Sequence, residues 1–197
     1  MSALNLFGVT RPRPPAAANG LALRGALHLN LRSAGSKGTR RVPFSMVAYS
    51  GEPFSRPGVL EEFGCPVVVR VRGIDAGNGA LPILFDHGGP ALGRSRTVTI
   101  SKGCRLVVRG FLDRENRIAR EVIVKAREGT AWEASLGITC KPGDLEYFRS
   151  RNGIYWVNRR AYNAPLCLWV RCTLHEVSIV ARGLDGGTSV SLIGGLT

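Results

Sequence analysis

Short apolar runs, separated by glycine, proline and aspartate, cover the chain from Met46 onward, and this spacing is typical of strands. The runs lie at 67–72, 82–85, 96–100, 104–112, 154–158, 166–172 and 174–181. In the first of them, valines alternate with arginines, which predicts a half-buried strand. About seven such strands predict a mainly β, α+β domain built as a small closed or partly closed β-barrel with one or two helices.

One segment breaks the strand pattern. Within Arg117–Arg127, apolar residues recur at helical spacing, at Ile118, Val122 and Ala126. Gly129 follows in the position that favours the end of a helix. The sequence therefore predicts an amphipathic helix here. Residues 142–153 contain Pro142, Gly143 and Gly153, and we expect them to form an exposed loop.

Residues 1–45 differ in composition from the rest of the chain. They hold seven basic residues and no acidic one, within a net charge of +13 for all 197 residues. Prolines, alanines and a Ser/Gly stretch accompany this charge, so we expect a disordered basic arm followed by a folded domain at 46–197. Such an arm would attract nucleic acid, an anionic surface or an acidic scaffold, and a merely solvating role is an equal alternative.

Cysteine usage and hydropathy limit the class of protein. The five cysteines are odd in number and show neither a C-x-x-C pair nor zinc-finger spacing, so we expect no metal, no cofactor and no disulfide framework. Free cysteines fit a reducing compartment. No apolar stretch is long enough to span a bilayer, and the first residues lack a signal-peptide pattern. These features favour a cytoplasmic protein without membrane contact.

The segment that follows the predicted helix contains the first candidate site residue. Apolar side chains alternate onto one face, at Trp132, Ala134, Leu136 and Ile138. Ser135 then points the other way, beside Gly137, where a substrate backbone could approach a hydroxyl held on a rigid strand. A serine in a strand is ordinary, so this pattern allows a nucleophile without requiring one.

A histidine stands at the end of the predicted strand 82–85. His87 is followed by Gly88 and Gly89, so the strand anchors the ring while a turn leaves it open to substrate. Imidazole is the side chain best suited to proton transfer near neutral pH, which makes His87 a candidate general base. A turn-capping or surface histidine is the alternative.

The third candidate lies in the run 174–181. Alternation places Glu176 on the face of Leu174 and Val180, and His175 on the opposite face. A carboxylate among apolar neighbours needs a cationic or hydrogen-bonding partner. An imidazole that becomes charged during catalysis would be such a partner, with Glu176 as its orienting group. A structural ion pair with an arginine is a comparable alternative.

Taken in this order, three segments resemble the prohead proteases of tailed phages, which are capsid-maturation serine proteases with a fold similar to herpesvirus assemblin. The segments are an apolar strand ending in His with a Gly six residues on (Ile83 to Gly93), a helix leading to a Ser-hydrophobic-Gly strand (Arg117 to Ile138), and Leu-x-Glu-Val-Ser-Ile-Val (Leu174 to Val180). The resemblance covers roughly residues 65–190.

The resemblance implies a serine endopeptidase in which Ser135 is the nucleophile, His87 the base and Glu176 the third member. Because herpesvirus relatives use a second histidine, His175 stays open as an alternative third member. The implied substrates are capsid or scaffold protein segments and the chain itself. The implied location is the cytoplasm of a bacterial host, including the prohead, and a homo-oligomer and a weak nucleic-acid contact through the arm are compatible with it.

Two other functions are compatible with the sequence. The first is a basic nucleic-acid-binding β-barrel, although the few aromatic residues do not interleave with basic ones. The second is a non-catalytic capsid-assembly protein of the same fold, in which His87 and Ser135 would lie too far apart to form a hydrogen bond.

Overall fold

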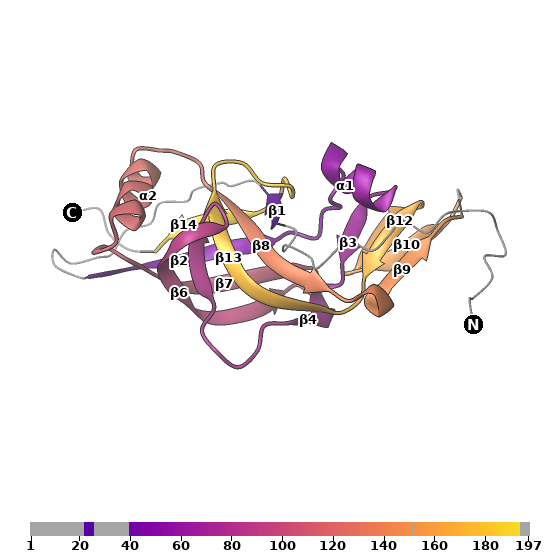
Figure 1. Ribbon diagram of the computed structural model, residues 1–197, viewed down its shortest axis with the longest axis horizontal. Coiled ribbons are helices and arrows are strands. Elements are labelled where there is room, and N and C mark those ends of the chain that lie inside the picture. The colour runs from indigo at the N-terminus through magenta and orange to yellow at the C-terminus, as the bar shows by residue number, and fades with distance from the viewer. Residues whose placement is uncertain (1–21, 26–39, 151, 194–197) are drawn as a thin grey trace.

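The computed structural model describes residues 22–25, 40–150 and 152–193. Strands dominate this part of the chain, accompanied by two α-helices, α1 (Pro57–Phe63) and α2 (Arg117–Arg127). The prediction of a mainly β protein with one or two helices is thus confirmed. Figure 1 shows an elongated molecule, with α2 and the largest sheet toward one end and α1 with a smaller sheet toward the other.

The largest sheet has nine strands, bonded in the order β1-β8-β13-β5-β6-β7-β2-β14 with β4 added on β13. Their bounds are β1 Ala22–Gly25, β2 Arg41–Tyr49, β4 Ile74–Asp75, β5 Pro82–Phe85, β6 Gly88–Ser101, β7 Arg105–Asp113, β8 Glu133–Cys140, β13 Cys172–Val180 and β14 Ser189–Leu192. The sheet curls so that β2 and β8 come into contact. Within the described residues its path has two ends, at β1 and β14, so no closed barrel is found.

Among the described residues, five strands of three or four residues lie outside this sheet. Three form a second sheet, β3 (Val67–Val69), β12 (Leu166–Trp169) and β9 (Leu145–Phe148), and two form a hairpin, β10 (Ile154–Val157) with β11 (Arg160–Asn163). The expectation of a loop at 142–153 is therefore wrong for β9. This strand pairs with β12, and Phe148 packs on the buried cluster around Val68 and Leu168, so pairing and burial outweigh the turn-forming composition.

The run at 67–72 is not the half-buried strand that its alternation predicts. Val67, Val68 and Val69 are all fully buried. Val67 and Val69 belong to the main hydrophobic core, whereas Val68 belongs to the smaller one, so β3 lies between the two cores. The chain then leaves the strand through a 3-10 turn at Val71–Gly73.

The folded part of the chain begins before residue 46. In β2, Val42 and Phe44 are buried while Arg41 and Pro43 are exposed, which is the alternation of a sheet strand with one face on the core. The strand β1 also lies within the segment predicted to be an arm. The remaining residues of that segment, 1–21 and 26–39, lie outside the described residues.

The helix α2 has the bounds that the sequence predicts, Arg117–Arg127. Its first turn is capped by the Asn116 side chain, which accepts a hydrogen bond from the Ala119 N–H at 3.1 Å. Past its end, Trp132 Nε1 donates to the Val122 carbonyl at 3.2 Å. This buried hydrogen bond ties the start of β8 to the helix and so helps to position the strand that carries Ser135.

Candidate active site

His87 lies on a two-residue turn between β5 and β6. Asp86 and His87 have φ values of 48° and 60°, the left-handed conformation that a tight hairpin turn of this kind requires at both positions. The Asp86 N–H donates to the Ile179 carbonyl at 3.1 Å, and the His87 N–H donates to Ser178 Oγ at 3.1 Å. Both bonds tie the turn to β13, so the imidazole is held over that strand.

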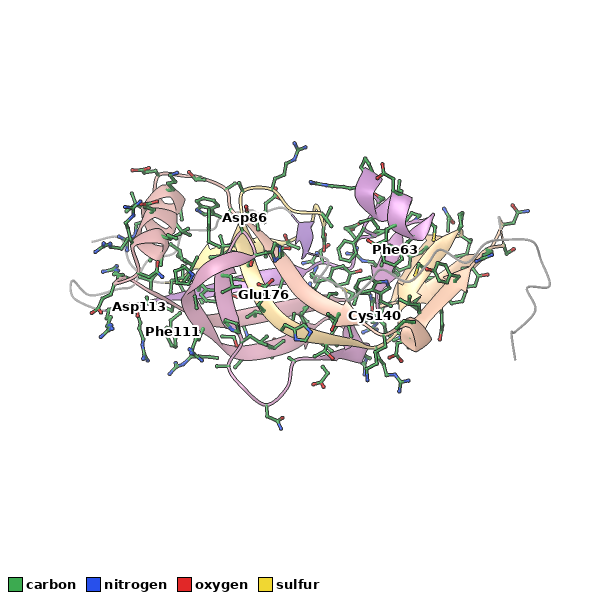
Figure 2. All side chains as sticks on the ribbon, in the orientation of Figure 1. Phe63, Asp86, Phe111, Asp113, Cys140 and Glu176 are labelled. Atoms are coloured by element: carbon green, nitrogen blue, oxygen red, sulfur yellow. The ribbon has the colours of Figure 1, made fainter. Side chains whose placement is uncertain are left out.

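Ser135 and Glu176 reach the same face of the sheet through the pairing of β8 with β13. Ser135 is opposite Ser178, and Gly137 is opposite Glu176. Directly opposed residues of an antiparallel pair project to the same side. The other side of these strands carries core residues, among them Leu136 and Val177. Figure 2 labels Glu176 in the middle of the large sheet, below the turn residue Asp86.

The register between β8 and β13 shifts between Leu174 and Glu176, so a β-bulge lies at His175. The bulge reverses the alternation along β13. Leu174 faces the main core together with Val177, whereas Glu176 lies on the opposite side. The expectation that Glu176 shares a face with Leu174 is therefore wrong, because one extra residue moves every later side chain to the other face.

The three residues form a continuous hydrogen-bonded chain. His87 Nδ1 lies 2.6 Å from Glu176 Oε1, and His87 Nε2 lies 2.7 Å from Ser135 Oγ. An ionised carboxylate can only accept, so Nδ1 carries the proton and donates to Glu176. In the neutral imidazole Nε2 then carries no proton and accepts from the Ser135 hydroxyl. This is the tautomer in which an imidazole can withdraw the serine proton.

Ser178 is a fourth member of this cluster, one to which the sequence reasoning assigned no role. Its hydroxyl donates to Glu176 Oε2 at 2.7 Å and accepts from the His87 N–H. The side chain is fully buried. Ser178 therefore holds both the carboxylate and the turn that carries the imidazole. The sequence does contain one indication of this role. Ser178 lies two residues after Glu176, and residues two apart in a strand project to the same face.

The side chains of the site are largely shielded from solvent, and among the described residues no arginine forms an ion pair with Glu176. The side chains of His87 and Glu176 are 14% and 13% exposed, and Ser135 is completely buried. Among the described residues, the arginine ion pairs go to Asp113, Glu115, Glu121, Glu52 and Asp144. None goes to Glu176, whose carboxylate oxygens are hydrogen-bonded by His87 and Ser178. The alternative of a structural arginine pair at Glu176 is therefore wrong within this part of the chain.

His175 takes no part in this chain. Its Nε2 lies 2.8 Å from Thr139 Oγ1, in an exposed position. Thr139 lies two residues along β8 from Gly137, the residue opposite Glu176, so His175 contacts a different position of that strand. Of the two residues considered for the third position, the structure brings Glu176 to His87.

Gly137 has a different role from the one expected. A Cβ placed there would lie 2.2 Å from Glu176 Oε1 and 2.6 Å from Glu176 Cγ. The glycine therefore makes room for the Glu176 side chain, whose Oε1 also lies against His87 Nδ1. We expected this space to admit a substrate backbone, but the carboxylate fills it.

Comparisons of the chain with known protein families, with curated proteins and with solved structures found no match. In the described residues no group of three or more His, Cys, Asp or Glu side chains is arranged to hold a metal ion. No helix in this part of the structure is long and apolar enough to cross a membrane.

Proposed function

We propose that this protein is a serine-type hydrolase that cleaves peptide bonds by acyl transfer. The observation that carries the proposal is the hydrogen-bonded chain from Glu176 through His87 to Ser135. Ser135 projects from a regular strand, so its hydroxyl is held in one orientation. The geometry also opposes the non-catalytic alternative, which required His87 and Ser135 to lie apart.

The residues have distinct roles in this proposal. His87 Nε2 takes the proton of Ser135 as Oγ attacks the peptide carbonyl, and it returns that proton to the leaving amine. Water then attacks the acyl-enzyme while His87 accepts its proton, and His87 returns that proton to Ser135 Oγ as the ester bond breaks and the acid product leaves. Glu176 fixes the tautomer and stabilises the imidazolium that forms at each step. Ser178 positions Glu176 through Oε2.

The resemblance to prohead proteases supports the finer part of the proposal. On that basis, the substrates are capsid or scaffold protein segments and the chain itself, the reaction belongs to virion maturation, and it takes place in the bacterial host cell or within the prohead. The partly closed barrel of that family is likewise part of the proposal, since the large sheet curls without a pairing that closes it in the described residues.

Covalent labelling tests the proposed function directly. A fluorophosphonate probe reacts with serines whose proton a base withdraws, and His87, the proposed base, is partly exposed. We expect one adduct per folded chain, mapped by peptide mass spectrometry to Ser135. Heat-unfolded protein is the matched control, since it keeps every serine but loses the His87 contact. An adduct spread over several serines, or none in the folded chain, contradicts the proposal.

Replacing Gly137 with Ala should impair the site without unfolding the protein. The new Cβ would displace Glu176 Oε1, because the two atoms would lie 2.2 Å apart. Displacement of an orienting group by about 1 Å costs on the order of 10²-fold in rate. Gly143→Ala is the matched control, since its Cβ would meet nothing within 4 Å. The labelling rates and melting temperatures of both variants measure this effect. Equal labelling rates in the two variants would show that Gly137 does not help to position Glu176.

A further inference from the structure

Within the described residues, the strand that carries Ser135 has one edge paired with β13 and the other edge paired with β1. In the antiparallel register of β1 on β8, Arg24 is opposite Ser135 and Ala22 is opposite Gly137. Among the described strands, β1 ends the path of the sheet, and β8 is its partner there. A four-residue extended segment of this same chain therefore lies along the strand of the nucleophile.

The position of β1 coincides with the place that a peptide would need. Opposed residues of an antiparallel pair have Cα atoms about 4.5–5.5 Å apart, so the β1 backbone at Arg24 runs next to Ser135. Ser135 itself is completely buried. A second chain cannot add to this edge of β8 while β1 occupies it. Edge addition uses main-chain hydrogen bonds, which any extended peptide can form.

We propose that this edge of β8 binds peptide substrates as an added antiparallel strand, and that Ala22–Gly25 occupies it as an intramolecular competitor. The inference rests on the proposed function, because an edge beside Ser135 affects turnover only when Ser135 is the nucleophile. A tethered segment competes at a high effective concentration even when its own pairing is weak. Substrate then binds only to the fraction of molecules in which β1 has left β8.

Proline substitutions in β1 test this proposal in the full-length chain. Successive residues of a strand point their N–H groups to opposite edges, so the double variant Leu23→Pro/Arg24→Pro removes one N–H that faces β8. We expect fluorophosphonate labelling of Ser135 to become about tenfold faster, as the open fraction rises. Amide hydrogen exchange in residues 133–140 should also become faster, a readout that does not depend on activity. Ala16→Pro/Ala17→Pro adds the same prolines outside β1 and should change neither measurement.

A synthetic peptide of residues 20–27 provides the second arm of the test. Added to the double-proline variant, it should slow labelling of Ser135 and restore protection of 133–140. Unchanged labelling and exchange in the variant, with no effect of the peptide, would overturn the intramolecular competitor while the proposed function stands. Faster exchange without any labelling of Ser135 in either protein would overturn the proposed function, and this inference with it.

Discussion

Replacing Ser135 with Ala is expected to lower hydrolysis of a p-nitrophenyl ester and of fluorescent casein by at least about 10³-fold. His87→Ala should cause a loss of similar size, because an unactivated serine hydroxyl is a weak nucleophile. In the proposed mechanism the two residues act as a unit through the 2.7 Å contact between Oγ and Nε2. The double variant should therefore be no slower than either single variant.

The control for this experiment is Ser45→Ala, which removes a half-buried serine from β2, away from the cluster. It should hydrolyse both substrates at the wild-type rate. Intact mass gives an independent readout, since self-trimming is expected in the wild-type chain and not in Ser135→Ala. Activity that survives in Ser135→Ala, or losses that add up in the double variant, would show that the serine and histidine do not form one catalytic unit.

The second large effect is expected at Glu176. In Glu176→Gln, the neutral amide cannot stabilise the imidazolium, and its NH₂ group facing Nδ1 would select the tautomer that cannot take the Ser135 proton. We expect a fall in turnover of about 10³–10⁴-fold, with folding largely retained because the side chain volume is kept. Initial rates and melting curves measure these two quantities separately.

His175→Ala is the matched comparison, since His175 was the competing third member. Its ring lies beside Thr139 on the exposed surface, so the variant should keep the wild-type turnover. A larger loss in His175→Ala than in Glu176→Gln would reverse the assignment. The comparison also separates a direct contact with His87 from a general disturbance of the bulge, because both residues lie at it.

Local patterns were sufficient to predict several elements. The helical spacing in 117–127 and the following Gly129 predicted α2 with the bounds that the structure shows. The apolar run at 82–85 predicted β5 equally well. These features depend on contacts between near neighbours in the chain and on one buried face, so period and turn chemistry suffice to locate them. The mainly β class follows from the same local information.

Other features of the site depend on contacts between residues that lie far apart in the chain. Whether Glu176 or His175 meets His87 depends on a bulge in the pairing of β8 with β13, and a bulge leaves no periodic signal in either strand. The role of Gly137 depends on which residue stands opposite it, and the pairing of Ala22–Gly25 depends on an edge contributed by residues 133–140. Alternation describes one strand, whereas register is a property of two.

For the site itself, local patterns were sufficient to predict the residue types: a serine on a strand, a histidine after a strand and a carboxylate in an apolar run. The tertiary structure brings these residues together, with 2.6 Å between His87 Nδ1 and Glu176 Oε1 and 2.7 Å between His87 Nε2 and Ser135 Oγ. It also places the Ser178 hydroxyl on Glu176. Sequence patterns could not predict these contacts because Ser135 and Glu176 lie 48 and 89 residues from His87 along the chain. Contacts across such separations are set by how the strands pair in the sheet, which no single stretch of sequence encodes.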